Sequence, residues 1–176
     1  MGSKLVWMDM EFTGLDPLEN KVLEVATAVT DDQLNNVTAG PEIVVHQPDN
    51  VLDSMDEWNT KHHKESGLTE KSRKSSETIE SAQKKTLNFL RKQTEKNQSP
   101  LCGNSVHMDR WFMKHHMPQV DRYLHYRIID VSTIKELVER WHPQTLKYEK
   151  KNTHRARQDI LESISELKYY RKKLGL

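Results

Sequence analysis

Two carboxylates near the start of the chain are spaced for metal chemistry. Asp9 and Glu11 lie two residues apart in a short, mostly apolar run, and residues i and i+2 of a β-strand project to the same face. Two carboxylates held that close repel each other unless a cation lies between them, and a divalent ion is the usual solution. The alternative is that the pair forms the polar face of an edge strand.

Two later acids and a histidine extend this pattern. Asp109 follows the Gly103-Asn104-Ser105 turn, and Asp159 follows His154 by five residues. Four acids and one histidine are what a two-metal phosphodiester-cleaving site requires, with the histidine as a general base on the segment leading into a helix. Simpler explanations remain open. Asp109 can be a helix-start acid favoured by the helix dipole, Asp159 a surface acid and His154 a loop residue.

The apolar pattern predicts the elements that must position these residues. Strands first, and then strands alternating with helices, predict an α/β fold with a mixed central sheet flanked by helices. The expected strands are Lys4–Met10, Val22–Thr30, Val37–His46, Pro100–Gly103 and Tyr126–Asp130. The expected helices are Asp53–His63, Thr78–Arg91, His107–Met117, Ser132–Trp141 with Ser132 as its N-cap, and Arg155–Leu174.

The composition is that expected of one globular domain over residues 1–176. No apolar run is long enough for a membrane span, so we expect no membrane partner. The 27 basic and 26 acidic residues leave little excess charge for gripping a long nucleic acid, which favours a short one. The single cysteine, Cys102, excludes an internal disulfide and favours a reducing, intracellular compartment. We expect the cytoplasm, or the mitochondrion if a transit peptide precedes this sequence.

Taken together, these segments resemble oligoribonuclease, a family of 3′→5′ exonucleases in the DEDDh group. The similarity runs from Leu5 to about Arg171, and the sequence of these segments is closer to that of the eukaryotic members. It is carried by Asp9-Met10-Glu11-Phe12-Thr13-Gly14-Leu15-Asp16, by His46-Gln47-Pro48 with Met55-Asp56-Glu57-Trp58, by Gly103-Asn104-Ser105, by the run from Tyr123 to Thr133 and by His154-x-Ala156-x-x-Asp159.

The resemblance implies a ribonuclease-H-like fold, a homodimer and two divalent metal ions, Mg²⁺ or Mn²⁺. In such a site Asp9 bridges both ions, Glu11 and Asp159 complete the nucleophile side, and Asp109 serves the leaving-group side. His154 takes the proton from the attacking water, and in-line attack on the last phosphodiester releases a 5′-mononucleotide.

The resemblance also implies a pocket for very short RNA, di- to pentanucleotides. Leu15 and Trp58 match positions that sandwich the terminal bases, although Trp58 can also be explained as a core aromatic residue. The matches at the 5′ phosphate are Ser105, Arg127, Ser132 and Lys135. His125 and Tyr126 match residues that the partner subunit supplies.

Two residues depart from the family pattern. Gln158 stands where relatives often carry a second acid, and Arg157 stands where an apolar residue is usual. Neither is an expected ligand, so we expect activity to survive. Two other functions stay open: a DEDDh exonuclease acting on DNA ends or on longer RNA tails, and a non-catalytic nucleic-acid-binding module.

Overall fold

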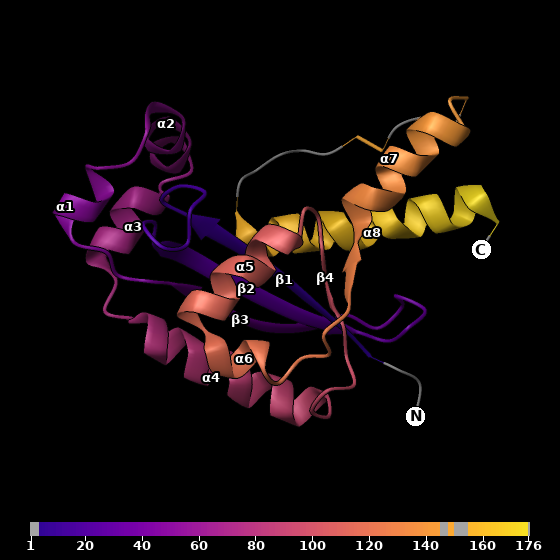
Figure 1. The fold of residues 1–176 in the computed structure, drawn as a ribbon, viewed down its shortest axis with the longest axis horizontal. Coiled ribbons are helices and arrows are strands. Elements are labelled where there is room, and N and C mark those ends of the chain that lie inside the picture. Colours follow the sequence, from indigo (N-terminus) through magenta and orange to yellow (C-terminus); the bar gives the residue numbers. More distant parts are fainter. Residues whose placement is uncertain (1–3, 145–147, 150–154, 176) are drawn as a thin grey trace.

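A mixed five-stranded sheet forms the centre of the molecule, in the order β3-β2-β1-β4-β5 (Figure 1). The computed structural model describes residues 4–144, 148–149 and 155–175. β1 is the middle strand, antiparallel to β2 and parallel to β4, so the edge-strand explanation of Asp9 and Glu11 is wrong. The strands span Leu5–Phe12 (β1), Val22–Thr30 (β2), Thr38–Val44 (β3), Leu101–Gly103 (β4) and Ile128–Asp130 (β5).

Helices cover both faces of this sheet. α4 packs on β2 and β3 and α5 on β1, whereas α8 packs on β1, β2 and β4 from the other side. Among the described residues, no helix combines the length and the apolar character needed to cross a membrane. The helices span Asp49–Leu52 (α1), Glu57–Glu65 (α2), Leu68–Lys74 (α3), Ile79–Gln93 (α4), His107–His116 (α5), Pro118–Asp121 (α6), Val131–Trp141 (α7) and Ala156–Leu174 (α8).

The alternation of side chains along β1 decides which layer the acids meet. Leu5 and Trp7 are buried in the same cluster as Ile160 and Ile164 of α8, whereas Val6, Met8 and Met10 pack with the α4 and α5 side. Asp9 and Glu11 continue the odd-numbered series. Both carboxylates therefore face α8, at the end of the sheet towards which β1 runs.

The predicted α/β architecture is confirmed, with differences in the helices. The helix predicted over Asp53–His63 begins too early, because α2 begins only at Glu57, where Asp56 caps it by accepting from the Asn59 amide at 2.8 Å. Ser132 is not the N-cap of α7. That residue is Asp130, whose carboxylate accepts from the Ser132 amide at 2.9 Å. The sequence pattern also missed the short helices α1, α3 and α6.

Candidate active site

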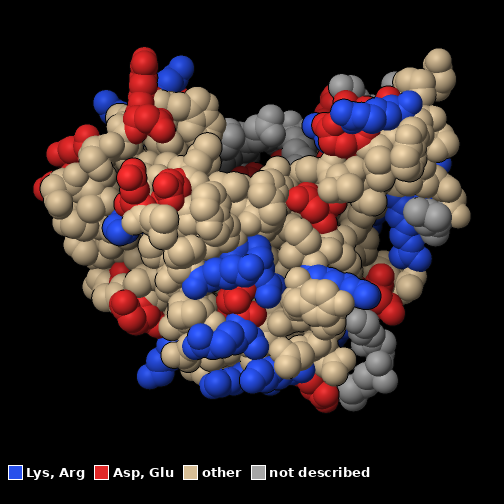
Figure 2. Space-filling view, viewed as in Figure 1, with Lys and Arg blue, Asp and Glu red and all other residues tan. Residues whose placement is uncertain are grey.

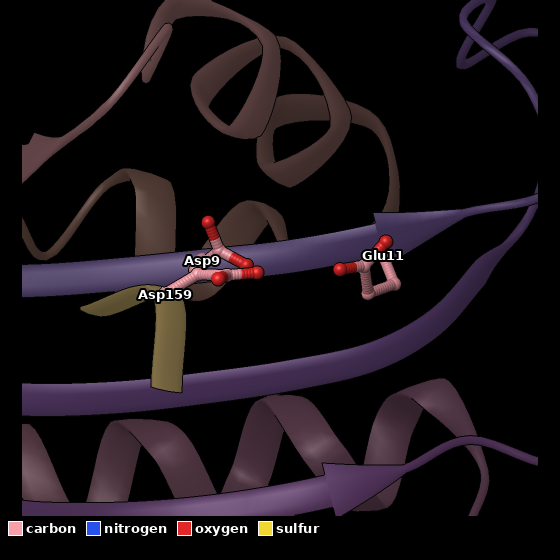
Figure 3. Close-up of side chains that lie close together, drawn as sticks. All are labelled: Asp9, Glu11 and Asp159. Atoms are coloured by element: carbon pink, nitrogen blue, oxygen red, sulfur yellow. The ribbon is translucent and has the colours of Figure 1, made fainter. Parts of the chain in front are cut away.

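Three carboxylates converge between β1 and the first turn of α8. Asp9, Glu11 and Asp159 each offer an oxygen within 4.8 Å of the others, and Figure 3 shows all three side chains turned towards the same space. Asp159 reaches this point because Ile160 and Ile164 bury the inner face of α8 against Trp7. The packing of α8 in the core therefore fixes the position of Asp159.

The environment of Asp9 and Glu11 opposes the ionisation of their carboxyl groups. Burial, followed by the charges of Asp109, Glu11 and Asp159, raises the pKa of Asp9 well above its ordinary value. Burial is also the main cause that raises the pKa of Glu11 to about 8, with Asp159 and Glu24 adding to it and Arg155 opposing it. A hard divalent cation prefers oxygen ligands, and its charge would relieve the repulsion among these carboxylates. This donor set therefore fits Mg²⁺ or Mn²⁺.

Asp109 lies beside this cluster but outside the group of three. It occupies the first turn of α5 and is only 5% exposed, so it is more than a surface acid at a helix start. Its charge is the strongest neighbouring influence that raises the pKa of Asp9. Burial raises the pKa of Asp109 itself, and hydrogen bonds to backbone groups of Asp109 and Met10 partly oppose that rise.

The expected general base, His154, lies outside the described residues, but its neighbour Arg155 is firmly anchored. The Arg155 guanidinium donates to both carboxylate oxygens of the buried Glu24, at 2.7 and 3.2 Å. Sequence reasoning missed this pair. Its only signal is a glutamate inside β2, a strand in which every residue is buried.

The two expected base-stacking residues are both exposed. Leu15 is 72% and Trp58 56% accessible, so the explanation of Trp58 as a core residue is wrong. The Trp58 ring stacks on His62 with the centroids 3.9 Å apart. His63, which sequence reasoning also missed, is buried and donates from Nε2 to the Phe12 carbonyl at 2.8 Å. This bond ties α2, and with it Trp58, to the end of β1.

The residues expected at a 5′ phosphate divide into two groups. Ser105 and Ser132 lie together, with the Ser105 amide donating to the Ser132 hydroxyl oxygen at 3.0 Å. Ser105 has a φ of 48°, a left-handed conformation that turns the chain sharply at the end of β4. Lys135 follows Ser132 by one turn of α7, since residues i and i+3 share a helix face.

Arg127 lies instead with the residues expected to come from the partner subunit. Its guanidinium carbon is 5.6 Å from the centre of the Tyr126 ring. The Tyr126 ring in turn lies 4.5 Å from the His125 ring and is 74% exposed. These side chains form an exposed stack that precedes β5.

Arg157, the departure from the family pattern, points away from the apolar face of α8. Its Nε donates to Glu42 of β3 at 2.8 Å, and its side chain is 48% exposed. A second nitrogen of the same guanidinium donates to the Gly40 carbonyl at 3.2 Å. Arg157 therefore adds a contact between α8 and β3 without disturbing the packing of Ile160.

Comparisons with known proteins agree with this geometry. Residues 6–167 match the model of the RNase T exonuclease family. The oligoribonuclease of Shewanella baltica strain OS155 is 51% identical over 173 residues, which cover 98% of this chain and 96% of that protein. This chain belongs to the oligoribonuclease family. The resemblance seen in the sequence is confirmed, and the chain is a nuclease rather than a non-catalytic binding module.

Other relatives extend the match. The oligoribonuclease of Acinetobacter baylyi is 50% identical over 170 residues, which cover 96% of this chain and 93% of that protein. Both relatives are bacterial, and the expected closeness to eukaryotic members of the family stays a prediction.

Solved structures show the same fold. Escherichia coli exonuclease I in complex with a dA16 oligonucleotide matches with a TM-score of 0.76 and 14% identity over 98% of this chain. A product-bound exonuclease I matches with a TM-score of 0.72 and 12% identity. This chain spans 42% and 44% of the length of those two chains. The predicted ribonuclease-H-like exonuclease fold is thereby confirmed.

Proposed function

We propose that this protein is a 3′→5′ exoribonuclease that degrades very short RNA, di- to pentanucleotides, to 5′-mononucleotides. The observation that carries the proposal is the convergence of Asp9, Glu11 and Asp159 within 4.8 Å, in a chain of the oligoribonuclease family. Residues 1–176 would form a single exonuclease domain.

Two divalent ions, Mg²⁺ or Mn²⁺, are the proposed cofactors. Asp9, Glu11 and Asp159 would hold them, and Asp109 would contribute on the leaving-group side. When bound, the ions supply stabilisation of the charge on the attacking and leaving oxygens. The raised pKa values of Asp9 and Glu11, to which the charge of Asp159 contributes, support this proposal, because a cation removes the repulsion among these carboxylates.

His154 is the proposed general base. An imidazole titrates near neutral pH, so it can accept a proton from the attacking water under physiological conditions. Its position in the sequence supports this role, because it directly precedes Arg155, which is held beside Glu11 and Glu24.

The substrate pocket would be built for a short strand. Leu15 and Trp58 would sandwich the terminal bases, which tolerates any sequence because every base has a π-face. Ser105, Ser132 and Lys135 would bind the 5′ phosphate, together with Arg127, whose planar fork suits phosphate oxygens. Figure 2 shows acidic and basic side chains interspersed on one face of the molecule, with basic ones most concentrated over α4 and α6, which fits the balanced counts of 27 and 26.

A homodimer would complete the pocket. The ring of Tyr126 is 74% exposed although it is large and apolar, and it stacks with His125 and Arg127 on the surface. An exposed aromatic stack of this kind is suited to contact a second subunit or its substrate. We therefore propose that His125 and Tyr126 act in the active site of the partner subunit.

The proposal is tested with a 5′-labelled pentanucleotide RNA incubated in Mg²⁺ or in EDTA. We expect a ladder that shortens from the 3′ end in Mg²⁺, no cleavage in EDTA, and slow cleavage of the same RNA carrying a 3′ phosphate. The variant Asp9→Ala should leave the RNA intact. Cleavage in EDTA, or an internal cut as the first product, would contradict the proposal.

A further inference from the structure

Glu24 is a buried charge with a specific partner. Its side chain is 0% exposed, and it accepts from the Arg155 guanidinium and from the backbone amide of Ala156, the latter at 3.2 Å. A buried carboxylate is costly unless it is paired and hydrogen-bonded. The position of Arg155 and of the first residue of α8 is therefore set by a side chain of β2.

The pairing continues outwards to β3. Arg155 also donates to one oxygen of Glu42 at 3.1 Å, and Arg157 donates to the other at 2.8 Å. Glu24, Arg155, Glu42 and Arg157 thus form an alternating chain of charges that we call the α8 anchor. Its outer link is partly exposed, at 28% for Glu42 and 48% for Arg157, and water screens it more than the inner link.

The α8 anchor also replaces a missing helix cap. The N-cap residue of α8 is Arg155, and no side-chain hydrogen bond from that residue caps the helix. The first amides of a helix need acceptors, and the Glu24 carboxylate supplies one to Ala156.

The inner link lies one helical turn from the metal cluster. The Asp159 amide donates to the Arg155 carbonyl at 3.0 Å, so a shift of Arg155 moves Asp159 with it. On the strand side, Glu24 lies directly opposite Glu11 in the β1–β2 ladder. The anchor therefore touches both elements that carry the acid cluster.

We infer that Glu24 and Arg155 are positioning residues, which hold the first turn of α8 so that Asp159 completes a high-affinity divalent cation site with Asp9 and Glu11. This inference rests on the proposed metal-dependent function. It assigns a role to residues that are neither expected ligands nor expected substrate contacts.

The test is the affinity of the full chain for Mn²⁺, measured by titration calorimetry at a temperature where circular dichroism shows each variant folded. Glu24→Gln keeps the size of the side chain and its acceptor for Ala156 but removes the charge opposite Arg155. We expect it to weaken Mn²⁺ binding by about 10- to 100-fold, the range typical of residues that orient metal ligands. The kcat on a dinucleotide should fall with it, while KM changes little.

Arg155→Lys provides a graded variant, since it keeps the charge but loses the two-pronged donation. It should bind Mn²⁺ with an affinity between those of the unaltered protein and Glu24→Gln. Glu77→Gln is the matched control, because Glu77 pairs with Lys85 of α4, which packs on the other side of the sheet from α8. It should bind Mn²⁺ like the unaltered protein.

The possible results are distinct. If Glu24→Gln and Arg155→Lys lower only the melting temperature and bind Mn²⁺ normally, the pair is merely structural and the inference is overturned. If Glu24→Gln does not fold, Arg155→Lys decides the question by the same criterion. If the unaltered protein does not bind Mn²⁺ at all, the proposed function itself fails, and the inference fails with it.

Discussion

Glu11 of β1 lies directly opposite Glu24 of β2 in the antiparallel ladder, yet only one of these glutamates is neutralised by a guanidinium. Like charges in such a pair destabilise a sheet. Arg155 binds Glu24 through two hydrogen bonds, whereas Glu11 belongs to the acid cluster and its pKa is raised to about 8. Glu24 therefore serves the structure by binding Arg155, whereas Glu11 remains available to a cation.

The raised pKa of Glu11 predicts that the metal-free protein loses stability as the pH rises. Between about 4.5 and about 8, the folded protein keeps the Glu11 proton that the unfolded chain has released. The folded state then binds more protons, so the free energy of unfolding falls through this window. Melting temperatures in EDTA should fall accordingly, and saturating Mg²⁺ should remove most of the decline by stabilising the ionised form.

Glu11→Gln is the control for this prediction. Burial lowers the pKa of His116, and this contribution makes the free energy of unfolding rise with pH. It is common to the unaltered protein and to Glu11→Gln. The difference between the two melting curves therefore isolates Glu11. Parallel pH profiles for the unaltered protein and Glu11→Gln would show that Glu11 does not hold a proton in the folded state.

Asp9→Asn should abolish turnover without unfolding the protein. Loss of one member of a catalytic unit typically lowers kcat by on the order of 10³-fold or more. In EDTA the same change should raise the melting temperature, because it removes an ionisable group whose charge four other carboxylates repel. Asp32→Asn, at an exposed position, is the control and should change neither quantity. Normal turnover by Asp9→Asn with a normal circular dichroism spectrum would remove Asp9 from the metal site.

Trp58→Ala should weaken substrate binding and leave stability nearly unchanged. The side chain is 56% exposed, so its loss opens no cavity in the core. Stacking on a base contributes about 1–3 kcal/mol, which corresponds to a fall of about 5- to 150-fold in kcat/KM on a dinucleotide. Trp141→Ala, at 68% exposure on α7, is the comparison. An equal effect of the two substitutions would mean that Trp58 has no specific contact with the substrate.

Tyr126→Ala should lower turnover by acting on the partner subunit. Mixed with Asp9→Asn, it should form heterodimers in which one site has both Asp9 and the tyrosine of the other chain. Random exchange in a twofold dimer makes about a quarter of all sites active in this way. Activity in the mixture well above the sum of the separate variants would support the composite site. A mixture no more active than that sum would contradict it.

The sequence predicted the acids better than the contacts that support them. The convergence of Asp9 and Glu11 could be predicted because their spacing matches the strand period within a mostly apolar run. Glu24 and Arg155 are 131 residues apart, and nothing in either local sequence indicates the other. Only a glutamate inside an otherwise uncharged strand indicated that Glu24 needed a partner.

The missed and misplaced elements have similar physical causes. In α3 only Leu68 and Ser72 are buried, so that helix has no apolar stripe to detect. Trp58 is a large apolar residue on an exposed face, and composition alone cannot distinguish such a residue from a core one. Asp130 ends β5 and caps α7 at once, so either it or Ser132 suited the cap by residue type.

The most direct test of the central claim is a time course on 5′-labelled RNAs of two, five and twenty nucleotides, each in Mg²⁺ and in EDTA. We predict fast, metal-dependent cleavage of the dinucleotide, slower cleavage of the pentanucleotide and an almost intact twenty-mer. Processive shortening of the twenty-mer at a comparable rate would contradict the short-RNA pocket and would point to a general exonuclease.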